Sequence, residues 1–353
     1  MSRGRQDQLQ IAVVAPMLLP VPPQNAGGTE RVIHDLIRGV IKLGHKVALF
    51  GPLDSRVDGA VEGPSVSVAQ LRETHSRVPG ATLPVLEAAL LDQVRQAADR
   101  FDAIHLHTEF AHAAVLHAVR PRTLTTVHWR CDELDRQLFF KAFPDLPVAA
   151  ISADQAKSIP ASNLQGIVHH GFEVDRYRAG PGSADTLAFL GRMTDQKRPE
   201  WAIELARRTD MGLKLAGNVD GGNPEHFRNH VEPHLDAKIE YCGEVDDRGK
   251  QNLFGHAAAL VLPVDWPEPF GLVMIEAMAC GTPVIAWNRG AVPEVIEHGV
   301  TGFVVDSMDE AEQAVSRLGE IDRTVVRKRF ETRFSADRMA RDYVRIYERL
   351  ARR

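Results

Sequence analysis

Short runs of β-branched and other apolar residues alternate with helical patterns along nearly the whole chain, and this alternation limits the possible folds most. In the first half we predict strands at residues 11–15, 46–50, 103–107 and 124–128, with helices at 29–43 and 84–98. Alternation of this kind requires a parallel sheet with helices on both faces. The first half is therefore predicted to be a doubly wound α/β domain.

The same alternation restarts in the second half of the chain. There we predict strands at residues 186–190, 213–216, 239–242, 259–262 and 283–286. Glycines and a proline punctuate residues 166–182 in the manner of a linker between domains. We expect an N-terminal Rossmann-like domain over residues 1–168 and a C-terminal one over 169–335.

The length and the end of the chain fit this division. A chain of 353 residues is long for one hydrophobic core and natural for two domains, which implies a cleft. Residues 335–349 predict a final amphipathic helix. Whether this helix, at about residues 336–353, packs back on the first domain is left open.

Composition argues against several kinds of partner. A formal net charge of -5 does not fit a protein that coats nucleic acid, because such binding needs a basic face. No stretch approaches the roughly 18 apolar residues that span a bilayer, so no integral membrane segment is expected. The polar first ten residues do not read as a signal peptide, and Cys131, Cys242 and Cys280 form no disulfide or zinc pattern. A cytoplasmic protein is the expectation.

A glycine pair, Gly27 and Gly28, lies between a proline-rich loop and a predicted helix, within residues 25–32. Such a pair lets the backbone approach an anion, and the helix start behind it points free N–H groups at the anion. A plain turn capped by Thr29 accounts for the segment equally well. The segment is not the G-x-G-x-x-G fingerprint, and Gly243–Lys250 lacks the spacing of a P-loop.

A second segment of interest follows the predicted strand 186–190. Gly191 ends that strand, Arg192 and Lys197 follow in the loop, and Pro199 suits the first turn of a helix. Cations just past the carboxyl end of a parallel strand lie where such sheets bind ligands, and a diphosphate would fit them. The alternative is ordinary solvated charge.

The most informative segment runs from Trp266 to Pro283. Its short apolar helix begins near Leu272 and contains Glu276, which needs a hydrogen-bonding partner among hydrophobic neighbours. The hydroxyl groups of a ligand could supply that partner. Glu268 precedes the helix, whose free N–H groups at the start could hold hydroxyl or phosphate oxygens.

With Glu268 and Glu276 forming an E-x7-E pair, the run from Glu268 to Gly290 closely resembles the retaining glycosyltransferases of family 4. The resemblance extends over nearly the whole chain, through residues 27–30, 102–107, 191–197 and 243–245. It implies the GT-B fold, in which two Rossmann-like domains face each other across a donor-binding cleft. Within the family, the Gly-Gly-Thr-Glu form is most like members that act on secondary metabolites or polysaccharides.

The resemblance also implies roles for side chains in binding a nucleoside-diphosphate sugar. Glu276 would bind the ribose hydroxyls and Glu268 the 3- or 4-hydroxyl of the donor sugar. Arg192 and Lys197 would neutralise the diphosphate leaving group. His128, at the end of the strand 124–128, matches the histidine that lies near the donor sugar in the family.

Other positions match through their backbone. The residues implied to contact the donor in this way are Gly27 and Gly28 at the diphosphate, Phe270, Gly271 and Leu272 at sugar and phosphate oxygens, and Val245 near the base. Trp129 stands where a smaller residue is more usual in the family, and it could stack on a sugar.

The implied reaction is the front-face transfer of a hexose-type sugar from a UDP- or GDP-sugar to an acceptor hydroxyl, with retention. No metal or other cofactor is expected, since the chain has no D-x-D sequence. His105 and His107 share one strand face and could be imagined as metal ligands, but a buried supporting role fits them better. The acceptor is an unidentified small molecule or saccharide.

Three other readings remain open. One is a sugar-nucleotide 2-epimerase or hydrolase of the same fold, and another is a protein that binds nucleotide sugars without transferring them. A dehydrogenase is disfavoured by the missing glycine fingerprint. The sequence does not identify the base or sugar of the donor, the acceptor, the oligomeric state or peripheral contact with a membrane.

Overall fold

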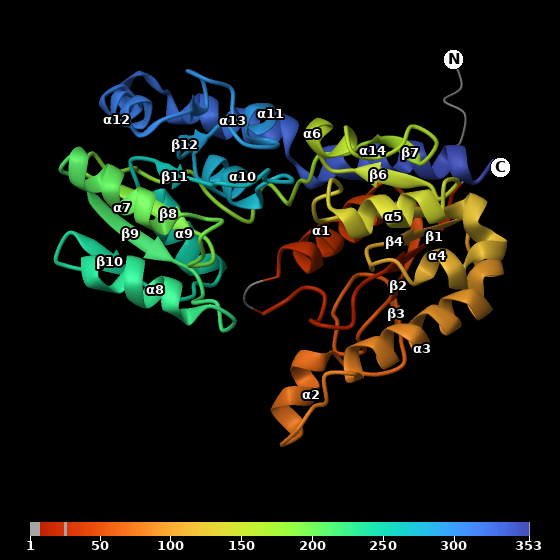
Figure 1. The fold of residues 1–353 in the computed structure, drawn as a ribbon. Coiled ribbons are helices and arrows are strands. Elements are labelled where there is room, and N and C mark those ends of the chain that lie inside the picture. Colours follow the sequence, from red (N-terminus) through yellow and green to blue (C-terminus); the bar gives the residue numbers. More distant parts are fainter. Residues whose placement is uncertain (1–7, 25–26, 353) are drawn as a thin grey trace, which may run out of the picture. The chain divides into compact units, whose positions relative to one another are not determined.

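The computed structural model describes residues 8–24 and 27–352, which form two compact α/β units. The first unit contains the described residues up to Phe172 together with those from Ala336 onward, and the second unit is Glu173–Ser335. Each unit has one parallel sheet with helices on both faces (Figure 1). The predicted α/β class with two doubly wound domains is confirmed.

The first unit contains a parallel sheet in the order β3-β2-β1-β4-β5-β6-β7. Its strands are β1 (Gln10–Val14), β2 (Lys46–Phe50), β3 (Ala60–Glu62), β4 (Ala103–Leu106), β5 (Thr123–Thr126), β6 (Val148–Ala150) and β7 (Leu164–Ile167). Its α-helices are α1 (Gly28–Lys42), α2 (Val68–Thr74), α3 (Thr82–Ala97), α4 (His112–Val115), α5 (Leu134–Ala142), α6 (Ala153–Ala156) and α14 (Ala336–Leu350). Short 3-10 turns at Ala98–Arg100 and His117–Arg122 lead into β4 and β5.

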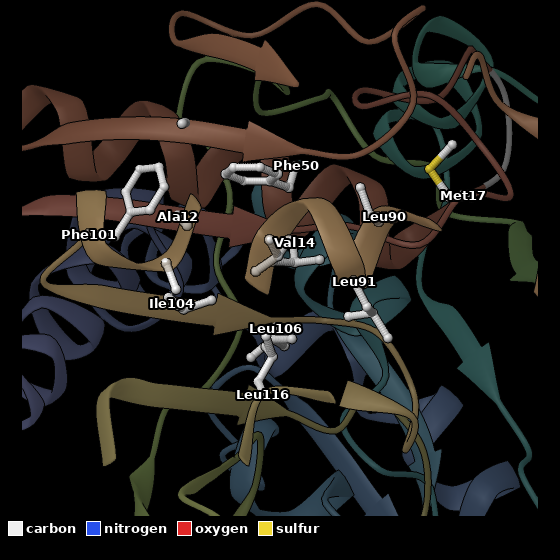
Figure 2. Close-up of a cluster of buried hydrophobic side chains, with 13 residues drawn as sticks. Ala12, Val14, Met17, Phe50, Leu90, Leu91, Phe101, Ile104, Leu106 and Leu116 are labelled. Carbon is white, nitrogen blue, oxygen red and sulfur yellow. The ribbon is translucent and has the colours of Figure 1, made fainter. Parts of the chain in front are cut away.

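One core of the first unit lies between the face of its sheet and α3. Alternate residues of β4, Ile104 and Leu106, point into this core, where Phe50 meets Phe101 edge to face at 5.7 Å (Figure 2). Because successive strand residues face opposite sides, His105 must point to the other face. Strand alternation thereby places a histidine under α14.

Helix α14 packs on α1 in the first unit. A Cβ added at Gly39 would lie only 2.7 Å from Cβ of Ala340, so the two helices approach closely at this glycine. Lys42 donates to both carboxylate oxygens of Asp337 at 2.8 and 2.9 Å. The last helix of the chain is thus part of the first unit.

The second unit has a parallel sheet in the order β10-β9-β8-β11-β12-β13. Its strands are β8 (Thr186–Leu190), β9 (Gly212–Ala216), β10 (Ile239–Tyr241), β11 (Leu260–Leu262), β12 (Val284–Trp287) and β13 (Gly302–Val305). Its α-helices are α7 (Pro199–Arg208), α8 (Pro224–His230), α9 (Asp247–Gly255), α10 (Leu272–Ala279), α11 (Val292–Val295), α12 (Met308–Ser316) and α13 (Arg323–Arg333), with 3-10 turns at Glu232–His234 and Leu318–Glu320.

Most predicted bounds differ from the observed ones by one or two residues, and two differences affect the site or the division into domains. The strand expected over 124–128 ends at Thr126. Beyond it, Gln155 Nε2 donates hydrogen bonds to the carbonyl oxygens of Val127 and Trp129 at 2.9 and 2.6 Å, in place of strand pairing. The segment 166–182, interpreted as a linker from its start, opens inside strand β7. Among the described residues, no helix is both long and apolar enough to cross a membrane.

Candidate active site

In the second unit the sequence-predicted residues gather where the order of strands reverses. Strand β8 lies between β9 and β11, so the loops that follow β8 and β11 diverge to opposite sides of the sheet. Such a switch point leaves a crevice at the carboxyl ends of the strands. Arg192 follows β8 by two residues, and Glu268 lies in the loop between β11 and α10.

Glu268 is buried and held by two side chains. Lys197 Nζ donates to Glu268 Oε2, and Trp266 Nε1 donates to the same oxygen at 2.9 Å. The side chains of Lys197 and Glu268 are only 16% and 9% exposed, so both charges are largely removed from water. The Lys197 ammonium also lies 5.0 Å from the centre of the Trp266 ring. The structure therefore brings the loop cation and the first glutamate together, as a buried ion pair.

Glu276 forms a second buried ion pair. Lys250 Nζ donates to Glu276 Oε1 at 2.6 Å, and the two side chains are 14% and 9% exposed. The carboxylate is expected from the sequence to need a partner, and Lys250 of α9 satisfies one of its two oxygens. The role of Glu276 toward a ligand stays a prediction.

The start of α10 is shaped by a glycine. Gly271, the N-cap residue, has φ 80° and ψ 68°, a left-handed conformation that favours glycine. The N–H groups of Gly271 and Leu272 have no hydrogen-bond partner among the described residues. Phe270 is buried and packs edge to face on Phe334 at 6.1 Å, which anchors the turn. Two free N–H donors thus stand beside the two carboxylates in the sequence.

Arg192 differs from the lysines nearby. Its side chain is half-buried and makes no hydrogen bond or ion pair with the residues that the structure describes. Arg192 therefore carries a charge that no protein group in the described part of the chain neutralises.

Val245 is half-buried between β10 and α9 and packs against Gly249, where an added Cβ would lie 2.8 Å from Cβ of Val245.

In the first unit, Gly27 caps α1 and Gly28 is its exposed first residue. Gly27 has φ 156°, and a Cβ there would lie 2.7 Å from Cγ of Pro23. Glu30, in the first turn, is buried, and desolvation raises its pKa. Asn25 and Ala26, which belong to the same predicted anion-binding segment, lie outside the described residues.

His128 lies two residues beyond β5 and contacts two other histidines. His107 Nδ1 and His128 Nε2 are 2.8 Å apart, and the ring of His170 stacks on that of His128 at 5.2 Å and 17°. Burial lowers the pKa of His128 to about 4, and lowers those of His107 and His170 well below their usual value. These imidazoles are neutral at pH 7.

His105 lies beside this group and ties it to α14. Its Nδ1 is 2.7 Å from the hydroxyl of Tyr347, and its Nε2 is 2.8 Å from Thr126 Oγ1, which also meets the hydroxyl of Tyr343 at 2.9 Å. Burial lowers the pKa of His105 to about 3. The rings of His105 and His107 are 4.1 Å apart, as expected for alternate residues on one strand face.

Sequence reasoning missed Lys250, His170 and the two tyrosines of α14. A lysine in a helix is ordinarily exposed, and nothing in the pattern of α9 marked Lys250 as buried. His170 stood in a stretch interpreted as linker. The tyrosines followed helical spacing and were seen only as the apolar face of a surface helix. Among the described residues, no group of three or more His, Cys, Asp and Glu side chains could hold a metal ion.

Each half of the chain matches a known glycosyltransferase family. Residues 176–324 match the family of group 1 glycosyl transferases, and residues 26–153 match glycosyltransferase family 4. Each matched region falls inside one of the predicted domains.

Individual relatives are similar along most of their length. The D-inositol 3-phosphate glycosyltransferase of Pseudarthrobacter chlorophenolicus is 25% identical over 340 residues, covering 82% of this chain and 81% of the relative. Among solved structures, AviGT4, a glycosyltransferase involved in avilamycin A biosynthesis, is similar with a TM-score of 0.74 and 22% identity, over 98% of both chains. HepE of Anabaena, solved with UDP-glucose, is similar with a TM-score of 0.70 and 18% identity, over 98% of this chain and 100% of HepE. These structures share the fold of the two units.

Proposed function

The chain belongs to the glycosyltransferases of family 4, with the GT-B fold, and we propose that it moves a hexose-type sugar from a UDP- or GDP-sugar to an acceptor hydroxyl. The acceptor is a small molecule or saccharide that is not yet identified. The observation that carries the proposal is the pair of buried carboxylates, Glu268 and Glu276, each neutralised by a lysine beside the switch point of the second unit.

These carboxylates suit a polyhydroxylated ligand that also carries negative charge. No side chain or backbone group among the described residues bonds Oε1 of Glu268 or Oε2 of Glu276, so each oxygen can accept a hydrogen bond from a hydroxyl group. Arg192 and the free N–H groups of Gly271 and Leu272 would hold diphosphate oxygens. Gly27, Gly28, Phe270 and Val245 keep the backbone roles that the family resemblance implies.

The chemistry that we propose is a front-face displacement with retention. The acceptor oxygen bonds to the anomeric carbon while the bond from that carbon to the β-phosphate oxygen breaks. The acceptor proton passes to the departing phosphate, and Arg192 and Lys197 stabilise the charge that develops there. The proposed reaction uses no metal ion. HepE was solved with UDP-glucose, which makes UDP-glucose the first donor to test.

A thermal-shift panel of UDP, GDP, dTDP, their sugar conjugates and NAD tests the proposal before any acceptor is known. A ligand at a hundred times its dissociation constant adds about 2.7 kcal/mol to stability. We expect one nucleoside diphosphate and its sugars to raise the melting temperature, with and without EDTA. Stabilisation by NAD alone would overturn the proposal.

Arg192→Ala tests the assignment of the leaving-group cation. We expect kcat to fall by about 100- to 1,000-fold, as for the loss of one preorganised donor to a developing anion. Exposed Arg248, beside the site on α9, provides the control as Arg248→Ala. NMR of the product gives the anomeric configuration, and release of free sugar or an epimer without an acceptor would show the hydrolase or epimerase alternative instead.

A further inference from the structure

Either ring could donate the hydrogen bond between His107 and His128, and the surroundings of the two rings indicate which one does. His107 is 4% exposed, and its Nδ1 lies 2.8 Å from His128 Nε2. The other ring nitrogen, His107 Nε2, is buried and has no hydrogen-bond partner among the described residues. Among the described residues, the His107 side chain therefore makes its one hydrogen bond to the histidine that the family resemblance places near the donor sugar.

Both rings are neutral at pH 7, so a single proton lies between them. Burial lowers the pKa of His128 to about 4 and that of His107 well below its usual value, with the neighbouring histidines adding to the effect. A neutral imidazole carries one N–H and one bare nitrogen. Either His107 Nδ1–H donates to His128, or His128 Nε2–H donates to His107.

The two arrangements differ at the buried Nε2 of His107. If His128 donates, His107 must carry its own proton on Nε2, which leaves a buried N–H without an acceptor. If His107 donates, Nε2 is a bare nitrogen. Buried N–H groups are very rarely left without an acceptor, and an under-used acceptor is tolerated more often. The arrangement in which His128 donates is therefore disfavoured.

We propose that His107 is a positioning residue that fixes the tautomer of His128, so that His128 carries its proton on Nδ1. That N–H has no partner among the described residues and is the hydrogen bond that the ring offers to a ligand oxygen. His170 stacks on the same ring and limits its rotation. This inference rests on the proposed function, since it assigns to His128 the role of a neutral donor toward a hydroxyl or phosphate oxygen.

The tautomer is measured directly by two-bond ¹H–¹⁵N correlation NMR on the full chain labelled in histidine, at pH 7.5 and without ligand. The signals of His128 are identified by their loss in His128→Gln. We expect a protonated Nδ1 and a bare Nε2 for His128 in the wild type, and a shift toward protonated Nε2 in His107→Phe. A proton on Nε2 in the wild type, or a tautomer that His107→Phe leaves unchanged, overturns the proposal.

Transfer rates separate positioning from mere packing. His107→Asn can still donate from its amide nitrogen, whereas His107→Phe fills the space without donating. We expect kcat to fall about 5- to 10-fold in His107→Phe, as for the loss of one hydrogen bond, and to recover in His107→Asn. Equal losses in both variants would overturn the proposal. His112→Phe is the matched control, because His112 is equally buried and bonds to Thr125 rather than to His128.

The two proposals fail separately. If no nucleoside diphosphate stabilises the protein while the NMR shows the expected tautomer, the proposed function fails and the tautomer assignment stands. If UDP or GDP binds, and His107→Phe has the same His128 tautomer and the same kcat as the wild type, the tautomer inference alone fails. Thermal unfolding of each variant checks that the first unit is still folded when its tautomer and kcat are measured.

Discussion

The two units use the same architecture but bury different polar groups at the carboxyl ends of their central strands. Both sheets are parallel, and in both the first strand of the unit lies centrally with its second strand on one side and its fourth on the other. The second unit buries two carboxylate–lysine pairs behind the switch point. The first unit buries imidazoles and hydroxyls at the corresponding ends of β4 and β5.

The difference shows two ways of keeping polar groups out of water. A buried carboxylate has to be paired, since an isolated charge in a low dielectric is very costly. An imidazole instead loses its proton and is held by hydrogen bonds, as the lowered pKa values of His105 and His128 show. The second unit therefore buries charged side chains at its switch point, whereas the first unit buries uncharged donors and acceptors at the ends of β4 and β5.

Breaking one buried ion pair gives the largest expected effect. In Lys197→Met, Glu268 keeps Trp266 Nε1 as a donor but loses the charge that neutralises it. We expect the free energy of unfolding of the second unit to fall by about 3–5 kcal/mol, as for other buried pairs that lose one partner. Urea unfolding followed by the fluorescence of Trp266 and its neighbours measures this loss. Transfer should fall by at least about 100-fold.

A double variant distinguishes charge burial from simple loss of packing. Lys197→Met combined with Glu268→Gln leaves no buried charge, so most of the stability should return while transfer stays low. A Lys197→Met protein as stable as the wild type would mean that the pair is solvated like a surface salt bridge. The comparison between the units would then fail.

The imidazoles predict a pH dependence confined to the first unit. Burial lowers the pKa values of His45, His105, His107, His112, His128 and His170 in that unit. As the pH falls below about 6.5, the unfolded chain takes up protons that the folded unit refuses, so stability decreases. Each such histidine lowers the free energy of unfolding as the pH falls from about 6.5 toward its own folded pKa.

Hydrogen exchange at pH 7 and pH 5, corrected for the intrinsic rates, measures this effect locally. We expect protection in β4 and β5 to fall much more than protection in β11 and β12. Glu30 and Glu87, whose pKa values are raised by burial, act in the opposite direction but are fewer. Equal losses of protection in the two sheets would contradict this prediction, which rests on the lowered histidine pKa values of the first unit.

The sequence predicted most of the long strands because their apolar runs are rich in β-branched residues. Strands β2 and β8 match their predicted bounds at both ends. The strands that it missed, β3, β6, β7 and β13, are three or four residues long, and two of them contain a glycine. Such short segments carry little periodic signal, so some of this length, such as β10 and β11, are predicted and others are not.

The site was predictable where chemistry leaves a local mark. The position of Glu276 inside an apolar helix predicted a buried carboxylate that needs a partner. Its partner, Lys250, comes from another helix 26 residues away, and such a contact depends on tertiary packing that one sequence does not reveal. His170 stacks on His128 from an even larger separation along the chain, which one sequence does not reveal either.

Two glycines at helix starts give the smallest predicted effect and compare the units directly. Gly27 caps α1 in the first unit and Gly271 caps α10 in the second, both with positive φ. An alanine at Gly27 would bring its Cβ to 2.7 Å from the rigid ring of Pro23, whereas at Gly271 it would meet the flexible end of Met274 at 2.6 Å. We expect Gly27→Ala to cost about 2–3 kcal/mol of unfolding free energy and Gly271→Ala about 1 kcal/mol, the strain of the backbone alone.

Urea unfolding of the two alanine variants measures the difference, with Gly44→Ala as the control. Gly44 has φ 95°, and no atom lies within 4 Å of an added Cβ, so its substitution reports backbone strain without a clash. Gly271→Ala should resemble this control because the methionine can move aside, and Gly27→Ala should exceed both. If Gly27→Ala matches the control, Pro23 yields to the new methyl group, and the start of α1 tolerates the substitution as well as the start of α10 does.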